Sequence, residues 1–372
     1  MLGRCGHHGA VPDHVRIAYT LEQCWHDVPG GTAVAALRIG ERLVRDSSVE
    51  LVGVAGRHRR PPPEPWRPPF PVAALPLARP WLYESWLRFR WPPVERATGP
   101  VDVCHATALV PAPTRAPLVV TVHDLAFLRA PDSFTRHGVR VMRRSLDRIK
   151  RHADIVVCPS QATMADLEAA GIGSDRLRLV PLGVDSTPAS PDEVGRVRAR
   201  LDLPSRFVLF VGTIEPRKNL ERLAPAVARL DEPLPLVIAG ADGWGGVADA
   251  VGAGSVDTRF LGFVDDRDLP GLYAAATVFA YPSVWEGFGL PVAEAMAQGT
   301  PVITSRGTST AEVAGGAAVL VDPLDVDDIA RGLTSALGER ERLSVAGRAR
   351  AAELTWEAAA AVTRAVYAEV RR

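Results

Sequence analysis

The sequence predicts an α/β fold built from two doubly wound parallel sheets, each wrapped by helices. Short apolar, β-branched runs alternate with helical stretches almost throughout the chain, which is the pattern of parallel sheets covered by helices. This pattern restarts near residue 207, after a stretch at 183–191 that looks like a linker. The length of 372 residues suits two domains, each large enough to bury its own core.

Each half of the chain supplies its own set of expected strands. Those of the first half begin at Val15, Val49, Val101, Leu118, Asp154 and Leu177, with helices expected near Thr32–Arg45, Pro80–Arg90, Ser133–His152 and Gln161–Ala170. Those of the second half begin at Phe207, Leu234, Thr258, Thr277, Thr300 and Ala317. A last helix, Trp356–Arg372, follows the second unit, and the proline-rich stretch at 58–71 is expected as a long surface loop.

Composition and charge exclude several classes of protein. The 43 basic residues equal the 43 acidic ones, so the molecule as a whole has no general attraction for nucleic acid. No apolar run reaches the roughly 18 residues that a membrane-spanning helix needs. There is neither a signal-peptide core nor a CxxC spacing, and the four cysteines are expected as free buried thiols. We therefore expect a soluble protein of the reducing cytoplasm.

The stretch at 281–297, YPSVWEGFGLPVAEAMA, carries the strongest functional signal. It predicts a strand, a loop that holds Glu286, and a helix with Glu294 in its first turn. Gly287 and Gly289 let backbone N–H groups approach a phosphate, and the helix N-terminus adds a positive dipole end. The two carboxylates suit sugar hydroxyls, so the stretch fits a sugar nucleotide. The alternative is a strand–loop–helix turn with solvated acids.

A second signal is GTIEPRKN at 212–219, which follows the first strand of the second half and opens a helix. Arg217 and Lys218 therefore lie at the carboxyl edge of a parallel sheet, where open α/β folds bind ligands. Two cations there can neutralise a diphosphate without a metal. Alone, such a pair is more often a solvated surface; together with the Glu286 loop on the same edge, it predicts a site.

Two weaker signals lie in the first half. Gly30 and Gly31 link the first strand to the first helix, with Thr32 expected as N-cap, and permit backbone contact with a phosphate or an acceptor. They lack the spacing of NAD or ATP sites, and a tight turn explains them equally well. His123, which ends the strand LVVTVHD, can bond a sugar hydroxyl or exchange a proton, unless neighbouring backbone satisfies it. His105 is treated in the same way.

An acidic motif and a basic helix complete the survey. Asp266-Arg267-Asp268 has the DxD spacing of some metal-dependent enzymes, but it directly precedes a helix, whose dipole explains it better, so we expect no metal. Arg136–His152 carries seven basic Arg and Lys residues against one acid, and this helix could contact an anionic membrane near a lipid-linked acceptor. A solvated charged face is the alternative.

The order and spacing of these motifs resemble the retaining glycosyltransferases of the mannosyl/glucosyl transferase group, known as glycosyltransferase family 4 or glycosyl transferases group 1. The likeness covers nearly the whole chain and includes TVHDLAFLRAPDSF from residue 121, CPSQATMADL from 158, VGTIEPRKNL from 211, RFLGFVDDRDLPGLYAAA from 259 and the E-x7-E element at 286–294. The family has the GT-B fold, two facing Rossmann-like doubly wound domains with a C-terminal helix crossing back to the first. The resemblance implies an acceptor-side domain at 1–185, a nucleotide-sugar domain at 186–353 and a returning helix at 354–372.

Carried over to this chain, the resemblance implies a donor site centred on the second domain. Arg217 and Lys218 would bind the nucleotide diphosphate, and Glu294 the ribose hydroxyls. Glu286, with the backbone of 287–289, would hold the transferred sugar and its phosphate. Thr213 stands where many relatives have arginine, which puts one phosphate contact in doubt and leaves more of that load on Lys218.

The resemblance also implies roles outside this centre. His123 would lie beside the transferred sugar, and Gly30 and Gly31 would face the phosphates from the opposite domain. The catalytic positions are thus Glu286, His123, Lys218 and Arg217. The donor-binding positions are Gly30, Gly31, Arg217, Lys218, Gly287, Phe288, Gly289, Leu290, Glu294, Phe263 and Val264.

The activity implied is hexosyl transfer from a nucleoside-diphosphate sugar to a hydroxyl of a glycan or lipid-linked saccharide. It would proceed with retention of configuration and without metal or other cofactor, and GTIEPRKN hints at GDP-mannose as the donor. Closure of the two domains would exclude water. Two rivals stay open: a sugar-nucleotide epimerase or phosphorylase on the same plan, and a non-catalytic module that binds a sugar nucleotide.

Overall fold

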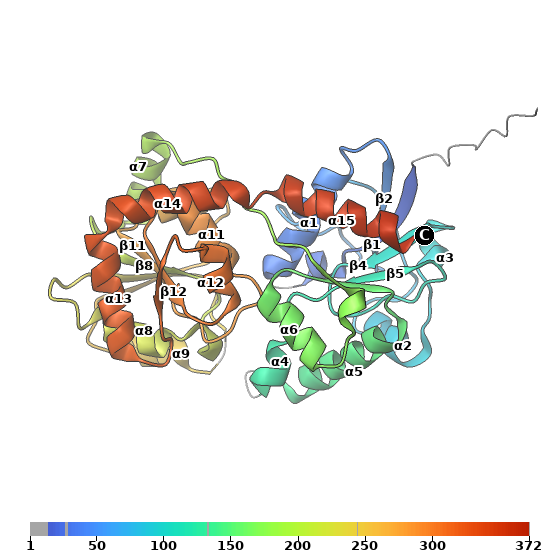
Figure 1. Ribbon diagram of the computed structural model, residues 1–372, viewed down its shortest axis with the longest axis horizontal. Helices are drawn as coiled ribbons and strands as arrows, with labels where there is room; N and C mark the ends of the chain where they lie inside the picture. The colour runs from blue at the N-terminus through green and yellow to red at the C-terminus, as the bar shows by residue number, and fades with distance from the viewer. Residues whose placement is uncertain (1–13, 27–28, 132–133, 244, 372) are drawn as a thin grey trace, which may run out of the picture. The chain divides into compact units, whose positions relative to one another are not determined.

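The structure, a computed structural model, describes residues 14–26, 29–131, 134–243 and 245–371, and it contains two parallel sheets (Figure 1). The first has the strand order β3-β2-β1-β4-β5-β6-β7, and the second has the order β10-β9-β8-β11-β12-β13. The strand pairs are parallel, for example β1 with β2 and β4, and β8 with β9 and β11. In both sheets the chain order reverses beside the first strand, so the doubly wound α/β fold predicted from the sequence is confirmed.

The first sheet contains all six strands expected in the first half and one more. Its strands are β1 Val15–Thr20, β2 Val49–Ala55, β3 Val72–Ala74, β4 Val103–Ala106, β5 Leu118–Thr121, β6 Ile155–Cys158 and β7 Leu177–Leu179. The accompanying helices are α1 Gly30–Leu43, α2 Trp81–Phe89, α3 Glu95–Thr98, α4 Ala126–Arg129, α5 Arg136–His152 and α6 Gln161–Ala169. The unexpected β3 is a three-residue edge strand directly after the proline-rich loop, too short to give a periodic signal.

The second sheet contains the six strands expected in the second half. They are β8 Val208–Val211, β9 Leu236–Ala239, β10 Thr258–Gly262, β11 Val278–Tyr281, β12 Val302–Ser305 and β13 Val319–Val321. The helices are α7 Pro191–Arg200, α8 Leu220–Val227, α9 Val247–Gly252, α10 Leu269–Ala275, α11 Leu290–Ala297, α12 Ser309–Ala314, α13 Val326–Gly338, α14 Arg340–Glu353 and α15 Trp356–Val370. Every residue of β9, β11 and β12 is buried, as expected of central parallel strands covered on both faces.

Contacts divide the chain into two compact units. Unit 1 comprises 1–121, 145–156 and 360–372, and unit 2 comprises 122–144 and 157–359. The His123 segment thus packs with the second half of the chain. The domain bounds predicted from the sequence stay a prediction.

The end of α15 packs within unit 1 through His105. The two nitrogens of this buried ring lie 2.7 Å from the Tyr367 hydroxyl and 2.7 Å from the Thr121 hydroxyl. Arg364 adds an ion pair to Asp46 at 3.2 Å. Because side-chain hydroxyls occupy both ring nitrogens, His105 has a structural role, although its partners are hydroxyls and not the neighbouring backbone that the alternative named.

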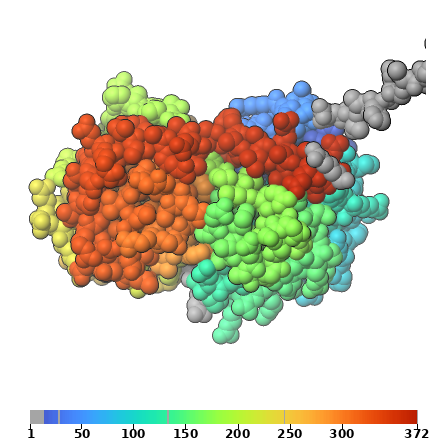
Figure 2. Space-filling model, in the orientation of Figure 1, coloured from blue at the N-terminus to red at the C-terminus, as the bar shows by residue number. Residues whose placement is uncertain are grey.

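In unit 2, α14 supports α11 from the outside. Gly347 of α14 is buried against Met296 of α11. A Cβ on Gly347 would lie 3.4 Å from the Cα, Cβ and Cγ of Met296. The outer side chains of α14 lie on the face seen in Figure 2. Since α11 follows the Glu286 loop directly, this packing fixes one end of the candidate site.

The described cysteines, Cys24, Cys104 and Cys158, are free and buried, as predicted. Cys5 lies outside the described residues. Among the described residues, no helix is both long and apolar enough to cross a membrane.

Candidate active site

The loop after β11 is shaped by two glycines. Gly289 has φ 104°, a left-handed conformation that favours glycine, and α11 starts immediately after it. At Gly287, any Cβ would collide with the carbonyl oxygen of His123. The backbones of the His123 and Glu286 loops therefore touch directly, and the structure brings these two predicted segments together within unit 2.

Two hydroxyls at the start of α6 hold the contact between the His123 and Glu286 loops in place. The Ser160 Oγ donates to the carbonyl of Gly287 at 2.7 Å, and the Thr163 Oγ1 donates to the same carbonyl at 3.2 Å. Both donors are fully or almost fully buried. Ser160 also caps α6, which follows β6. The residue that ends the β6–α6 connection therefore positions the loop that follows β11.

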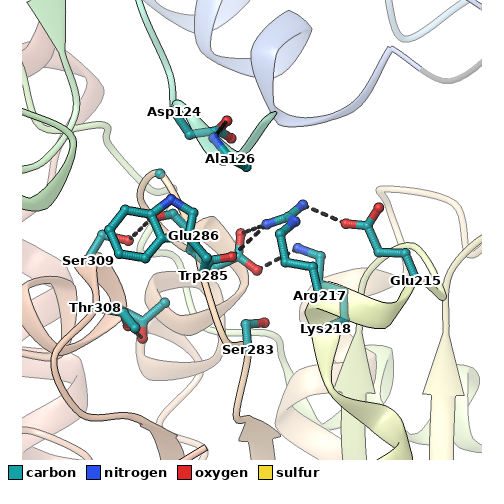
Figure 3. Close-up of polar contacts among 12 residues, drawn as sticks. Asp124, Ala126, Glu215, Arg217, Lys218, Ser283, Trp285, Glu286, Thr308 and Ser309 are labelled. Carbon is teal, nitrogen blue, oxygen red and sulfur yellow. Dashed lines mark hydrogen bonds and ion pairs between the residues drawn. The ribbon is translucent and has the colours of Figure 1, made fainter. Parts of the chain in front are cut away.

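Glu286 forms a buried ion-pair cluster with the two predicted cations (Figure 3). Its Oε1 lies 2.7 Å from the Lys218 Nζ, and its Oε2 lies 2.8 Å from the Arg217 Nη1. The other end of the Arg217 fork pairs with Glu215 at 2.6 Å, and Lys218 also donates to the Tyr281 hydroxyl at 2.6 Å. Two acids and two bases thus balance in one cluster at the carboxyl ends of β8 and β11.

The cluster favours the charged forms of Glu286 and Arg217. Burial works to raise the pKa of the Glu286 carboxyl, but the charges of Arg217 and Lys218 outweigh it and lower this pKa to about 2. For Arg217, burial alone would lower the pKa, yet Glu286, Glu215 and Asp124 raise it above its usual value. Glu286 is therefore an ionised, acceptor-only group at neutral pH.

Backbone contacts tie the two cluster-bearing loops to each other. Pro216–Lys218 is a 3₁₀ turn, and Asn219 after it adopts a left-handed conformation with φ 65°. The Asn219 side chain donates to the carbonyl of Pro282 at 2.9 Å, and Val284 N–H donates to the carbonyl of Arg217 at 2.9 Å. The GTIEPRKN stretch is thus bound to the Glu286 loop as well as to its own helix.

Glu294 lies just beyond the first turn of α11, in which the sequence predicted it. The helix begins at Leu290, so Glu294 is its fifth residue and not a first-turn residue. The reason is that Pro291 occupies the second helical position and not the first. The carboxylate of Glu294 is half-buried and accepts a hydrogen bond of 2.8 Å from the Tyr273 hydroxyl.

The remaining predicted donor-site residues are more dispersed. Phe288 is buried, Leu290 is half-buried, and Phe263 is 70% exposed beside the buried Val264 after β10. Gly30 and Gly31 are exposed at the start of α1 in unit 1. The predicted Thr32 cap is wrong: α1 begins at Gly30, and the Thr32 hydroxyl donates to the Pro29 carbonyl.

The DxD-like motif has protein partners. Asp268 is the N-cap residue of α10, as its position before the helix predicted, and its buried carboxylate pairs with Arg196 and Arg200 of α7. Among the described residues, no three His, Cys, Asp or Glu side chains gather as metal ligands.

Each half of this chain matches a known protein family. The family described as Glycosyltransferase Family 4 matches residues 29–187, and Glycosyl transferases group 1 matches residues 195–351. The O-antigen chain mannosyltransferase B of Escherichia coli is 35% identical over 254 residues, which are 64% of this chain and 67% of that protein. The chain is a family 4 glycosyltransferase.

Other relatives of this glycosyltransferase are named for similar activities. The MMP alpha-(1->4)-mannosyltransferase of Mycolicibacterium hassiacum is 36% identical over 59% of this chain and 55% of that protein. The solved structure of Anabaena Alr3699/HepE in complex with UDP and glucose has a TM-score of 0.70 at 20% identity, covering 96% of this chain and 99% of that one. The structural likeness supports the GT-B fold.

The structure adds residues to the site of this glycosyltransferase that sequence reasoning missed. Glu215 holds Arg217, Tyr281 bonds Lys218, and the Ser309 Oγ donates to the carbonyl of Glu286 at 2.7 Å. Glu215 had a signal, since an acid two residues before an arginine lies within GTIEPRKN itself. Tyr281 opens the 281–297 stretch but had no signal of its own there, and Ser309, the first residue of α12, had none either.

Proposed function

We propose that this glycosyltransferase moves a hexosyl group from a nucleoside-diphosphate sugar to a hydroxyl of a glycan or lipid-linked acceptor. The observation that carries the proposal is the buried cluster of Glu286, Lys218 and Arg217 in a chain of this family. A carboxylate has about four lone-pair sites, and the two cations occupy two of those on Glu286. The carboxylate would accept sugar hydroxyls with its remaining capacity, while Lys218 would supply positive charge for a leaving diphosphate.

For the donor we propose GDP-mannose. Its support is GTIEPRKN in the sequence and the names of the relatives, several of which are mannosyltransferases. We further propose that no metal takes part, because Lys218, Arg217 and the backbone amides near Gly289 can balance the departing charge.

A donor screen tests both proposals at once. The full chain is mixed with GDP-, UDP-, dTDP- and ADP-sugars in the presence of EDTA, and its melting temperature is followed. GDP-mannose at one hundred times its Kd should stabilise the folded state by about 2.7 kcal/mol. No shift with any sugar nucleotide would overturn the donor site, and a larger shift with another sugar would overturn GDP-mannose. A GDP-mannose shift that appears only when a divalent metal replaces EDTA would overturn the metal-free proposal.

We propose that transfer retains the anomeric configuration, with the acceptor attacking on the face that the diphosphate leaves. The support is membership of the family alone, since residue spacing does not report stereochemistry. NMR of the first product formed should show the same anomeric configuration as the donor, and an inverted centre would refute this. The same spectra separate the rivals: an epimerase releases an altered sugar nucleotide, a phosphorylase requires phosphate, and a binding module forms no product.

Contact of α5 with an anionic membrane, and a place at the inner membrane face of the cytoplasm, stay predictions. One observation supports them. Arg148 of α5 donates to the carbonyl of Leu87 in α2 at 2.9 and 2.7 Å, so the basic helix runs beside a helix end with exposed aromatic residues. Phe89 is 75% exposed and Trp91 is 42% exposed there, and aromatic side chains beside arginines suit a lipid headgroup layer.

A further inference from the structure

Trp285, the residue directly before Glu286, is held firmly within the site. Its carbonyl accepts a hydrogen bond of 2.8 Å from the Arg217 Nη1. The guanidinium of Arg129 lies 3.9 Å from the centre of its ring, within the range of a cation–π contact. Arg129 is itself fixed, since its Nε and Nη2 donate to Asp166 at 3.1 and 2.5 Å. Both the backbone and the ring of Trp285 therefore have a defined orientation.

The one polar atom of the Trp285 ring makes no hydrogen bond within the described part of the protein. The indole Nε1–H of Trp285 is buried and has no hydrogen-bond partner among the described residues. In contrast, Trp86 donates to the carbonyl of Pro92 at 3.0 Å, and Trp25 donates to that of Arg60 at 2.9 Å. A buried N–H without a partner is costly and rare in folded proteins, so a fixed donor of this kind beside an ionised carboxylate calls for a ligand.

An acceptor lies on the same side of the site. In Figure 3 the nitrogen edge of the indole faces Asp124, above the cluster of Glu286 and Arg217. Asp124 is half-buried and its Oδ1 accepts a hydrogen bond of 3.0 Å from Ala126 N–H, which sets the carboxyl group in place. A carboxylate has room for further donors beyond that one bond.

We propose that Trp285 and Asp124 bind one hydroxyl of the transferred sugar between them. The indole N–H donates to the hydroxyl oxygen, and the hydroxyl proton is donated to the Asp124 carboxylate. A hydroxyl satisfies both groups, whereas a phosphate oxygen, which carries negative charge, would be repelled by Asp124. This inference rests on the proposed function and extends it, because the pair would select sugars that have a hydroxyl at that position.

Two substitutions test the pair in the full chain. Trp285→Phe keeps an aromatic face for Arg129 and removes the N–H, and Asp124→Asn keeps an oxygen for Ala126 and removes the charge. Calorimetry without acceptor gives the Kd of the sugar nucleotide and of the matching nucleoside diphosphate. Relative to the nucleoside diphosphate, each variant should bind the sugar nucleotide about 5- to 10-fold more weakly than wild type does. The double variant should lose less than the product of the two, because both groups hold one hydroxyl.

A control and a set of analogues sharpen the result. Trp86→Phe removes a satisfied N–H from unit 1, so it should lower the melting temperature and leave both affinities unchanged. Among donors that each lack one sugar hydroxyl, one should bind wild type more weakly than the intact donor does. Trp285→Phe should bind that deoxy donor and the intact donor equally well. Equal losses of sugar nucleotide and nucleoside diphosphate would show that the ring merely supports the loop and would overturn the inference, as would wild-type donor affinity in Trp285→Phe. Failure of wild type itself to bind any sugar nucleotide would instead refute the proposed function.

Discussion

Replacing Lys218 with alanine should lower kcat/KM for the nucleotide sugar at least about 30-fold, which corresponds to about 2 kcal/mol of transition-state stabilisation. The ammonium group is buried and lies 2.7 Å from Glu286, so its loss removes a charge that water cannot replace. Steady-state kinetics with the donor found in the screen measure the effect. Unchanged turnover would show that the diphosphate binds elsewhere.

Lys218→Arg gives the matched control for this prediction. The chain contains only two lysines, Lys150 and Lys218, among its 43 basic residues, so arginine serves almost everywhere else. A lysine kept at a buried position indicates that a compact point charge is needed there, and a planar guanidinium should not fit between Glu286 and Tyr281. We expect Lys218→Arg to be nearly as inactive as Lys218→Ala. Melting curves of both variants separate loss of activity from loss of fold.

Replacing Glu286 with glutamine should abolish most activity and also destabilise the protein by about 3 kcal/mol at neutral pH. The carboxyl has a pKa of about 2 in the folded state, against an ordinary value of 4.5. A lowered folded pKa means that the ionised form stabilises the fold above pH 4.5, and that this stabilisation is lost as the pH falls toward 2.

Urea unfolding between pH 7 and pH 3 measures this dependence. Wild type should lose stability progressively below about pH 4.5, and Glu286→Gln should lack the part of that slope that Glu286 supplies. Glu294→Gln is the comparison, since Glu294 is only half-buried and should have a smaller effect on stability. A wild-type pH slope in Glu286→Gln would contradict the ion-pair cluster.

The fold was largely predictable from the sequence because its strands are local apolar runs. Continuous runs such as those of β9 and β11 need no partner to be recognised, since burial on both faces shows in the composition. The edge strand β3 was missed because three residues carry no period. The exact helix starts at Gly30 and Leu290 were also missed, because a proline can precede a helix or take its second position.

The residues of the site were predictable as a set, while their mutual contacts were not. Motif order indicated Arg217, Lys218 and Glu286, and the structure places all three in one cluster. That the cations pair with Glu286 in the free protein depends on distances across two loops that are 68 residues apart in sequence, which no local pattern reports. The orphan N–H of Trp285 is equally invisible in sequence, since it is defined by what surrounds it.

The joint between the His123 and Glu286 loops bears on how the enzyme is made. Ser160 bonds Gly287 across 127 positions, and the backbone N–H of Gln161 bonds Glu312 across 151. A ribosome adding roughly 5–20 residues each second needs several seconds to cover that interval. During this time the beginning of α6 has been synthesised and its partners have not, so the nascent chain must keep polar backbone groups hydrated until the last third arrives. The contacts that join the start of α6 to Gly287 and Glu312 are thus completed late in translation, after most of the first sheet can already have formed.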